Sequence, residues 1–167
     1  MTAGEATFTF SHVELPVANL AAMEDFYVRV LGFAVTDRGA PGPGEMVFLS
    51  RDPAEHHQLV LRQAGGAAAG PRTVDHFAFR AGNLAELRGV HGVLAVDPGL
   101  AVETVSHGTT WSLYFRDPEG NRLEVFADTP WHVDQPVRFD IDLGLSDEAL
   151  IASTEAAIRD RPGFRRR

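Results

Sequence analysis

Two stretches of the chain decide its architecture: HVELPVANLAAMEDF at residues 12–26 and HFAFRAGNLAELRGV at residues 76–90. They share identical residues at four matching positions, and a histidine, His12 or His76, begins each stretch. A second echo follows in the same order, because Arg-Asp-Pro at residues 51–53 returns at residues 116–118, with a spacing only one residue wider. Two repeated motifs that occur in the same order and at nearly the same spacing indicate an internal duplication.

Each copy predicts a βαβββ unit. The alternation at residues 7–17 is typical of a half-buried strand, and Asn19 is a suitable cap for a helix that ends at Gly32. Further strands are expected at 33–37, 45–50 and 58–62, and the second copy repeats the plan with a strand at 73–80, a helix at 83–91 and strands at 102–106, 112–116 and 122–127. A Pro/Gly turn at 40–44 lies between two strands, and residues 64–71 join the copies.

The prediction is therefore an α+β fold made of two paired βαβββ modules, residues 7–64 and 72–128, that form an incomplete barrel. Residues 129–167 fall outside the repeat and form a C-terminal extension. Within it, Ser146 caps a short helix whose first turn is acidic, and Pro162 ends that helix. Trp131, just after the last repeated strand, either covers the mouth of a pocket or packs on the surface.

Composition excludes several classes of protein. The 167 residues include no cysteine, which rules out disulfides, iron–sulfur clusters and a cysteine nucleophile, so any metal must be held by His, Asp or Glu. Lys and Arg number 15 against 23 Asp and Glu, and a net charge of −8 disfavours binding to nucleic acid. No apolar run approaches membrane-spanning length and the N-terminus lacks the features of a signal peptide, so we expect a cytoplasmic protein without a membrane partner.

Three residues are candidate metal ligands. His12 and His76 occupy matching positions at the first strand of each copy, and Glu124 interrupts the apolar strand NRLEVF, where a carboxylate is costly unless it is paired or metal-bound. If Arg116 faces Arg122 across the hairpin, Tyr114 faces Glu124. A structural histidine on a strand and a structural Tyr–Glu hydrogen bond remain the alternatives. Two histidines and one carboxylate form the donor set of non-haem Fe(II) oxygenases.

These motifs resemble the vicinal oxygen chelate superfamily, which includes glyoxalases, bleomycin- and fosfomycin-resistance proteins and extradiol dioxygenases. The resemblance rests on residues 12–33, 75–87 and 107–126 and covers most of residues 8–128. HGTTWSLYFRDPEGNRLEVF is similar to the metal-binding end of one-domain type I extradiol dioxygenases. The resemblance implies two modules around one metal, Fe(II) or alternatively Mn(II), held by His12, His76 and Glu124. It also implies that a catechol-type diol and O2 are the substrates, and it leaves a homo-oligomer open.

Other roles follow from the same resemblance. His57, in an HH pair before an apolar strand, is similar to the acid/base histidine of extradiol enzymes, the alternative being a surface histidine. Tyr114 is similar to a tyrosine that hydrogen-bonds the substrate, and His107 to the histidine that precedes it, although the loop between them is shorter here. The Arg-Asp-Pro echo places Leu59 opposite Glu124, on the strand face of His57, and leucine cannot be a fourth ligand.

Two rival functions stay open. One is another divalent-metal enzyme of the same fold, an isomerase, an epimerase or a thiol transferase; a glyoxalase-like isomerase would need a fourth protein ligand. A fosfomycin-type transferase would need a cationic pocket, and no lysine occupies a predicted strand face. The other rival is a metal-free drug-binding resistance protein, a class that lacks the ligand set present here. We therefore expect an Fe(II)-dependent extradiol dioxygenase that acts on a catechol-type diol.

Overall fold

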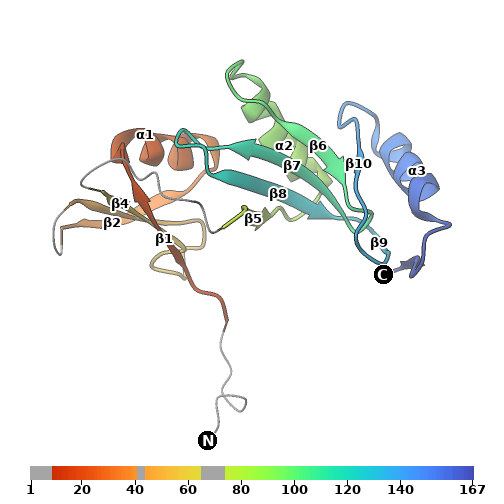
Figure 1. The fold of residues 1–167 in the computed structure, drawn as a ribbon, viewed down its shortest axis with the longest axis horizontal. Helices are drawn as coiled ribbons and strands as arrows, with labels where there is room; N and C mark the ends of the chain where they lie inside the picture. Colours follow the sequence, from red (N-terminus) through yellow and green to blue (C-terminus); the bar gives the residue numbers. More distant parts are fainter. Residues whose placement is uncertain (1–8, 41–43, 65–73) are drawn as a thin grey trace, which may run out of the picture. The chain divides into compact units, whose positions relative to one another are not determined.

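The computed structural model describes residues 9–40, 44–64 and 74–167, and the chain divides into two compact units, residues 1–71 and 72–167 (Figure 1). The predicted joint at 64–71 and the turn at 40–44 lie largely outside the described residues, as do the beginnings of both predicted first strands. Within the described residues, no helix is long and apolar enough to cross a membrane.

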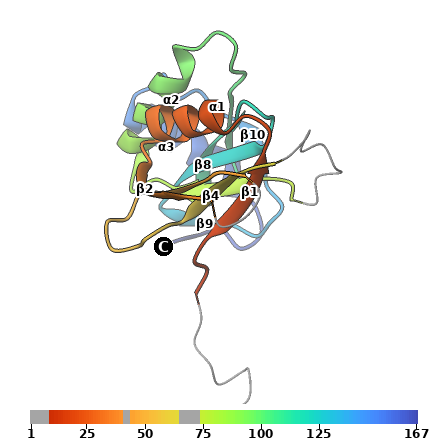
Figure 2. The same cartoon turned by 90° about the vertical axis from the view of Figure 1, so that its left-hand side faces the viewer.

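The first unit is a four-stranded sheet with one helix. It contains β1 (Val13–Val17), α1 (Leu20–Asp25) with a π-helical continuation η2 (Phe26–Val30), β2 (Ala34–Gly39), β3 (Met46–Ser50) and β4 (Leu59–Gln63), and Figure 2 shows α1 beside the sheet. The strand order is β1-β4-β3-β2, and only the β1–β4 pair is parallel. Asn19 caps the helix by accepting a hydrogen bond from the Ala22 amide, and Gly32 ends it at φ 70°.

The second unit repeats this plan. β5 (Phe77–Arg80) is followed by α2 (Leu84–Ala95), β6 (Glu103–Ser106), β7 (Thr110–Arg116) and β8 (Arg122–Asp128). β5 pairs with β8 in parallel, as β1 does with β4, and Asn83 caps α2 by accepting a hydrogen bond from the Glu86 amide. The α+β prediction of two βαβββ units is confirmed. α2 runs beyond the predicted end at residue 91 because Leu87 and Leu94, two turns apart, are both fully buried.

The C-terminal extension adds three short strands and a helix to the second unit: β9 (Trp131–His132), β10 (Phe139–Asp140), α3 (Asp147–Ile158) and β11 (Arg165–Arg166). β10 pairs with β6 and completes a five-stranded sheet in the order β10-β6-β7-β8-β5, while β9 and β11 pair with each other. Trp131 is buried and packs edge-on against Trp111, 6.5 Å away between ring centroids. Strands of two residues are too short for a sequence pattern to reveal.

Both first strands begin later than the sequence predicts, and this places the two histidines. β1 starts at Val13 and β5 at Phe77, so His12 and His76 each lie immediately before a strand. The predicted hairpin register is confirmed, because Tyr114 pairs with Glu124 and Arg116 with Arg122 between β7 and β8. Partners in register share a face of the sheet.

Candidate metal and substrate site

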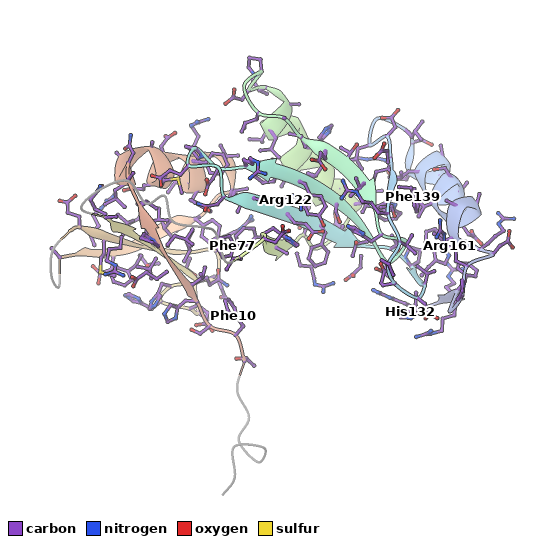
Figure 3. All side chains as sticks on the ribbon, viewed as in Figure 1. Phe10, Phe77, Arg122, His132, Phe139 and Arg161 are labelled. Atoms are coloured by element: carbon purple, nitrogen blue, oxygen red, sulfur yellow. The ribbon has the colours of Figure 1, made fainter. Side chains whose placement is uncertain are left out.

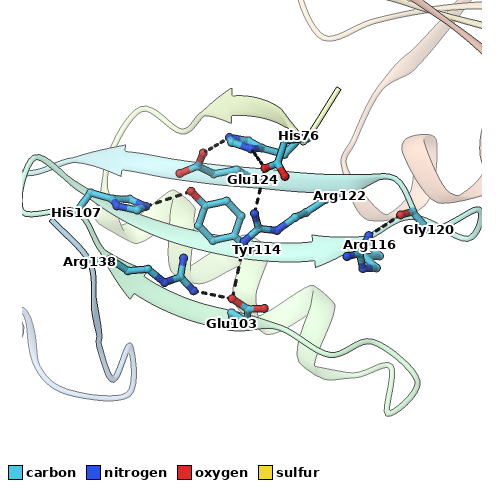
Figure 4. A network of polar contacts seen from close by, with 10 residues as sticks. His76, Glu103, His107, Tyr114, Arg116, Gly120, Arg122, Glu124 and Arg138 are labelled. Atoms are coloured by element: carbon cyan, nitrogen blue, oxygen red, sulfur yellow. Dashed lines mark hydrogen bonds and ion pairs between the residues drawn. The ribbon is translucent and has the colours of Figure 1, made fainter. Parts of the chain in front are cut away.

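His76 and Glu124 form a pair on one face of the second unit's sheet. His76 Nε2 lies 3.1 Å from Glu124 Oε2, and the Glu124 side chain is only 10% exposed (Figure 4). The parallel β5–β8 register makes Glu124 the neighbour of Ala78, two residues after His76 and on the same face. On the other side of the ring, Asp75 Oδ2 lies 2.8 Å from Nδ1.

Tyr114 and His107 extend this pair along the sheet. The Tyr114 hydroxyl lies 3.1 Å from His107 Nε2, and His107 Nδ1 lies 2.7 Å from the carbonyl oxygen of Val137. Because a carbonyl only accepts, Nδ1 of His107 carries a proton. The single hydroxyl proton of Tyr114 has two acceptors within reach, His107 Nε2 and the Glu124 carboxylate. Burial, and then the negative charge of Glu124, raises the pKa of Tyr114 to about 12, so its hydroxyl keeps its proton at neutral pH.

Four charged residues beside these groups were not among the predicted site residues. They come from separate parts of the second unit: Asp75, Glu103, Arg122 and Arg138. Arg122, labelled in Figures 3 and 4, lies with its guanidinium carbon 4.2 Å from the centre of the Tyr114 ring. Arg122 lies two residues before Glu124 in the same strand, so the sequence alone indicated that the two side chains share a face of the sheet. Asp75 directly precedes the candidate ligand His76. Glu103 lies in the strand that precedes that of Tyr114 and pairs with it, whereas no sequence spacing related Arg138 to the site.

In the first unit, His12 lies against His57. Their ring centroids are 4.4 Å apart in an edge-on arrangement, and His12 Nδ1 lies 3.2 Å from the Ser11 hydroxyl. His57 is half-buried, and its Nδ1 lies 2.8 Å from Nδ1 of His56. Burial is the largest cause that lowers the pKa of His57, followed by the proximity of His12 and His56. The lowered pKa favours a neutral His57 ring that can accept a proton.

In the first unit, the residue at the position equivalent to Glu124 is not the predicted Leu59. Glu14, two residues after His12, pairs with Val60, just as Ala78, two residues after His76, pairs with Glu124. Val60 therefore occupies this position, and Leu59 lies on the opposite face, because a shift of one residue reverses the face of a strand. His57 also lies outside β4, so its predicted alignment with Leu59 on one strand face is not realised. Valine, like leucine, cannot ligate a metal.

The candidate residues thus fall into two groups. The second unit brings together His76, Glu124, Tyr114 and His107, and the first unit brings together His12 and His57. Within neither unit do three His, Asp or Glu side chains of described residues gather as a metal site. His76 and Glu124 nevertheless fit two coordination positions, since ligands at right angles on one divalent ion lie about 3 Å apart.

Comparison with known proteins identifies related sequences. A sequence model of the glyoxalase/bleomycin resistance protein/dioxygenase superfamily matches residues 9–125. Biphenyl-2,3-diol 1,2-dioxygenase 2 of Rhodococcus globerulus is 30% identical over 169 residues, which cover 89% of this chain and 85% of the relative. Biphenyl-2,3-diol 1,2-dioxygenase 3 of the same organism is 35% identical, over 71% of this chain and 62% of the relative. Catechol-2,3-dioxygenase of Bacillus subtilis (strain 168) is 30% identical, over 71% of this chain and 41% of the relative.

Solved structures share the fold. A glyoxylase/bleomycin resistance protein/dioxygenase domain from Frankia sp. EAN1pec superposes with a TM-score of 0.65 and 25% identity, over 76% of this chain and 96% of that one. Lactoylglutathione lyase from Agrobacterium tumefaciens gives a TM-score of 0.54 at 24% identity, over 74% and 96% of the two chains. At 24% identity, the similarity to the lyase indicates a shared fold alone.

Proposed function

The chain belongs to the glyoxalase/bleomycin resistance protein/dioxygenase superfamily and has the vicinal oxygen chelate fold, and on this premise we propose that it is an Fe(II)-dependent extradiol dioxygenase. The substrate would be a catechol-type aromatic diol, cleaved beside its two hydroxyl groups with O2. Both oxygen atoms enter the ring-opened product, so the reaction needs no separate reductant. The relatives named as biphenyl-diol and catechol dioxygenases support this choice within the superfamily.

One observation carries the proposal: His76 Nε2 and Glu124 Oε2 lie 3.1 Å apart on the face that also holds Tyr114. A histidine nitrogen and a carboxylate oxygen, joined by His12, would form the two-His, one-carboxylate set that suits Fe(II) and leaves positions for substrate. Bound iron would supply the joint activation of the diol and O2. The same donor set also binds Mn(II), and the test therefore identifies the bound metal.

Tyr114 would orient the diol. Its hydroxyl hydrogen is donated within the protein, to His107 Nε2 or to the Glu124 carboxylate, so the lone pairs of its oxygen can accept a hydrogen bond from a substrate hydroxyl. With a pKa of about 12, the tyrosine stays neutral beside Glu124 and adds no second negative charge to the site. His107 holds the tyrosine in this orientation, because Val137 fixes the proton on its other nitrogen.

His57 would act as the general acid/base of the reaction. Its ring lies against His12, so it stands beside one of the three proposed ligands without belonging to the ligand set. A half-buried imidazole that is neutral near physiological pH suits a general acid/base. His56, hydrogen-bonded to His57 and more exposed, provides a route for the proton towards solvent.

Two observations favour this function over the rivals. Val60, which occupies the position equivalent to Glu124, cannot supply the fourth protein ligand that a glyoxalase-like isomerase would use. Arg122 and Arg138 do bring positive charge to the face of Tyr114, but each is paired with a carboxylate, Asp75 or Glu103. This neutralised pair does not form the cationic pocket that a phosphonate substrate requires.

The test is anaerobic purification followed by metal analysis and oxygen uptake on a panel of catechols, with absorbance detection of the ring-opened product. We expect about one iron or manganese per chain and oxygen uptake that equals product formation. Single alanine substitutions of His12, His76 and Glu124 should each remove most of the metal while the circular dichroism spectrum is unchanged. Full metal retention in Glu124→Ala, or uptake of no oxygen with every catechol by the metal-loaded protein, would contradict the proposal.

A further inference from the structure

A row of charged side chains crosses the face of the second unit's sheet that carries His76 and Tyr114 (Figure 4). This charged row consists of Arg138, Glu103, Arg122 and Asp75. Arg138 Nη2 lies 2.7 Å from Glu103 Oε2, the same oxygen lies 3.9 Å from Arg122 Nη2, and Arg122 Nη1 lies 3.2 Å from Asp75 Oδ2. The row ends at the imidazole of His76, 2.8 Å from Asp75.

The charged row draws on nearly every strand of the sheet. Arg138 precedes β10, Glu103 begins β6, Arg122 begins β8, and Asp75 lies two residues before β5. The central strand β7 contributes Tyr114, which is paired in register with Glu103 on one side and Glu124 on the other. The two arginines of the charged row therefore lie against the ring of Tyr114. The guanidinium carbons of Arg122 and Arg138 are 4.2 and 5.5 Å from the centre of the ring.

Asp75 and Glu124 contact opposite nitrogens of the His76 ring. A carboxylate accepts from a proton-bearing nitrogen, so Asp75, at 2.8 Å, favours a proton on Nδ1. In the metal-free protein Glu124, 3.1 Å from Nε2, is the competing acceptor for a ring proton. The repeat contains a matching contact, because Ser11, directly before His12, lies 3.2 Å from its Nδ1.

Arg122 joins two parts of the site. Its guanidinium donates to Asp75, which holds His76, and at the same time lies over the ring of Tyr114. A planar guanidinium suits both contacts, since it can hydrogen-bond in its plane while stacking on an aromatic face. Its side chain is only 26% exposed, which shields its contact with Tyr114, whereas the Asp75 carboxylate is 78% exposed. A displacement of Arg122 would therefore affect both the imidazole and the tyrosine.

We propose that Asp75 and Arg122 are positioning residues: Asp75 selects Nε2 of His76 as the ligating nitrogen, and Arg122 holds Asp75 and Tyr114 in one arrangement. The role in ligation rests on the proposed function. The choice of the protonated nitrogen does not, because it concerns the metal-free protein. Neither residue would touch the metal or the substrate.

The first experiment measures the protonation of His76 in the metal-free full chain by 15N-detected histidine NMR at mildly alkaline pH, with His76→Gln to assign the signals. We expect a protonated Nδ1 in the wild type and a bare Nδ1 with a protonated Nε2 in Asp75→Ala. Asp75→Asn, whose amide oxygen still accepts, should retain the wild-type pattern. A bare Nδ1 in the wild type, or a protonated Nδ1 in Asp75→Ala, would overturn the role of Asp75.

The second experiment measures the Kd for Mn(II) alone, by electron paramagnetic resonance of the free ion. Loss of a group that orients a ligating histidine typically costs 10- to 100-fold in metal affinity, and we expect a Kd increase in that range for Asp75→Ala. The matched control is Asp147→Ala, which removes an aspartate paired with Arg88 at 2.8 Å, and it should leave the Kd unchanged. An unchanged Kd in Asp75→Ala would overturn the role in ligation, whereas failure of the wild type to bind Mn(II) would count against the proposed function itself.

A double-mutant cycle tests whether Arg122 acts through Asp75. Arg122→Gln should raise the Kd by a smaller factor than Asp75→Ala, and Arg122→Lys should restore part of the loss. The double variant Asp75→Ala/Arg122→Gln should bind Mn(II) no more weakly than Asp75→Ala alone, because the second change removes the support of a group already absent. Fully additive effects on the Kd would overturn the coupling.

Discussion

The indole N–H of Trp111 in β7 donates a hydrogen bond to the hydroxyl of Thr154 in α3 over 2.9 Å, and the two side chains are 3% and 0% exposed. This bond joins the helix of the C-terminal extension to the central strand that carries Tyr114. Thr154→Val keeps the shape and leaves the buried indole without its acceptor. We expect a loss of about 1–3 kcal/mol in the free energy of unfolding, measured by urea denaturation.

The control for this prediction is the same change in a Trp111→Phe background. There the donor is already absent, so Thr154→Val should be close to neutral. An equal loss of stability in both backgrounds would show that the hydroxyl of Thr154 acts through some other contact.

The N-cap of α3 gives a second prediction. Ser146 Oγ accepts a hydrogen bond from the Ala149 amide, and Ser146→Ala should lower the free energy of unfolding by about 1 kcal/mol. Ser153→Ala, an exposed change within the same helix, is the matched control and should be neutral or slightly stabilising because alanine has the higher helix propensity. A loss in Ser153→Ala equal to that in Ser146→Ala would contradict the capping role.

The duplicated pattern was sufficient to predict both βαβββ units and the register of the β7–β8 hairpin. The hairpin was predictable because its turn joins strands that are adjacent in sequence, so Arg116 and Arg122 define the pairing of Tyr114 with Glu124. The parallel β1–β4 pair has no such turn. Its register follows from packing over a long connection, and the echo therefore indicated Leu59 where the structure places Val60.

The charged residues around the site show a similar limit. Arg122 shares the face of Glu124 by simple alternation, and that relation could be read from the sequence. Glu103 reaches Tyr114 through the antiparallel β6–β7 pair, in which the two residues are partners. Arg138 reaches Tyr114 only because β10, a strand of two residues in the extension, pairs with β6. Such a short strand has no periodicity, so its partner depends on tertiary packing alone.

The raised pKa of Tyr114 predicts a loss of stability at alkaline pH. An unfolded tyrosine ionises near pH 10, while Tyr114 in the folded protein ionises at about 12, so the unfolded state loses its proton first. The stability that arises from this pKa difference is fully present below pH 10 and is lost as the pH rises towards 12. In urea denaturation at stepped pH, Tyr114→Phe should lose less stability over this range than the wild type. Parallel curves for the two proteins would contradict the prediction.

The last prediction separates the proposed acid/base from the proposed ligands. His57 lies against His12 at 4.4 Å between ring centroids but is not itself assigned to the metal, so His57→Phe preserves an aromatic ring beside the ligand. A general acid/base contributes roughly 10²–10⁴-fold in rate, and we expect a loss of that size in oxygen uptake at saturating catechol, with the iron content retained. His56→Phe, the change at the more exposed neighbour, should cost far less, because the first proton transfer would remain. Tyr114→Phe should fall between the two, since one hydrogen bond to the diol is removed. Near-normal turnover in His57→Phe with its iron retained would remove His57 as the acid/base while leaving the ligands in place.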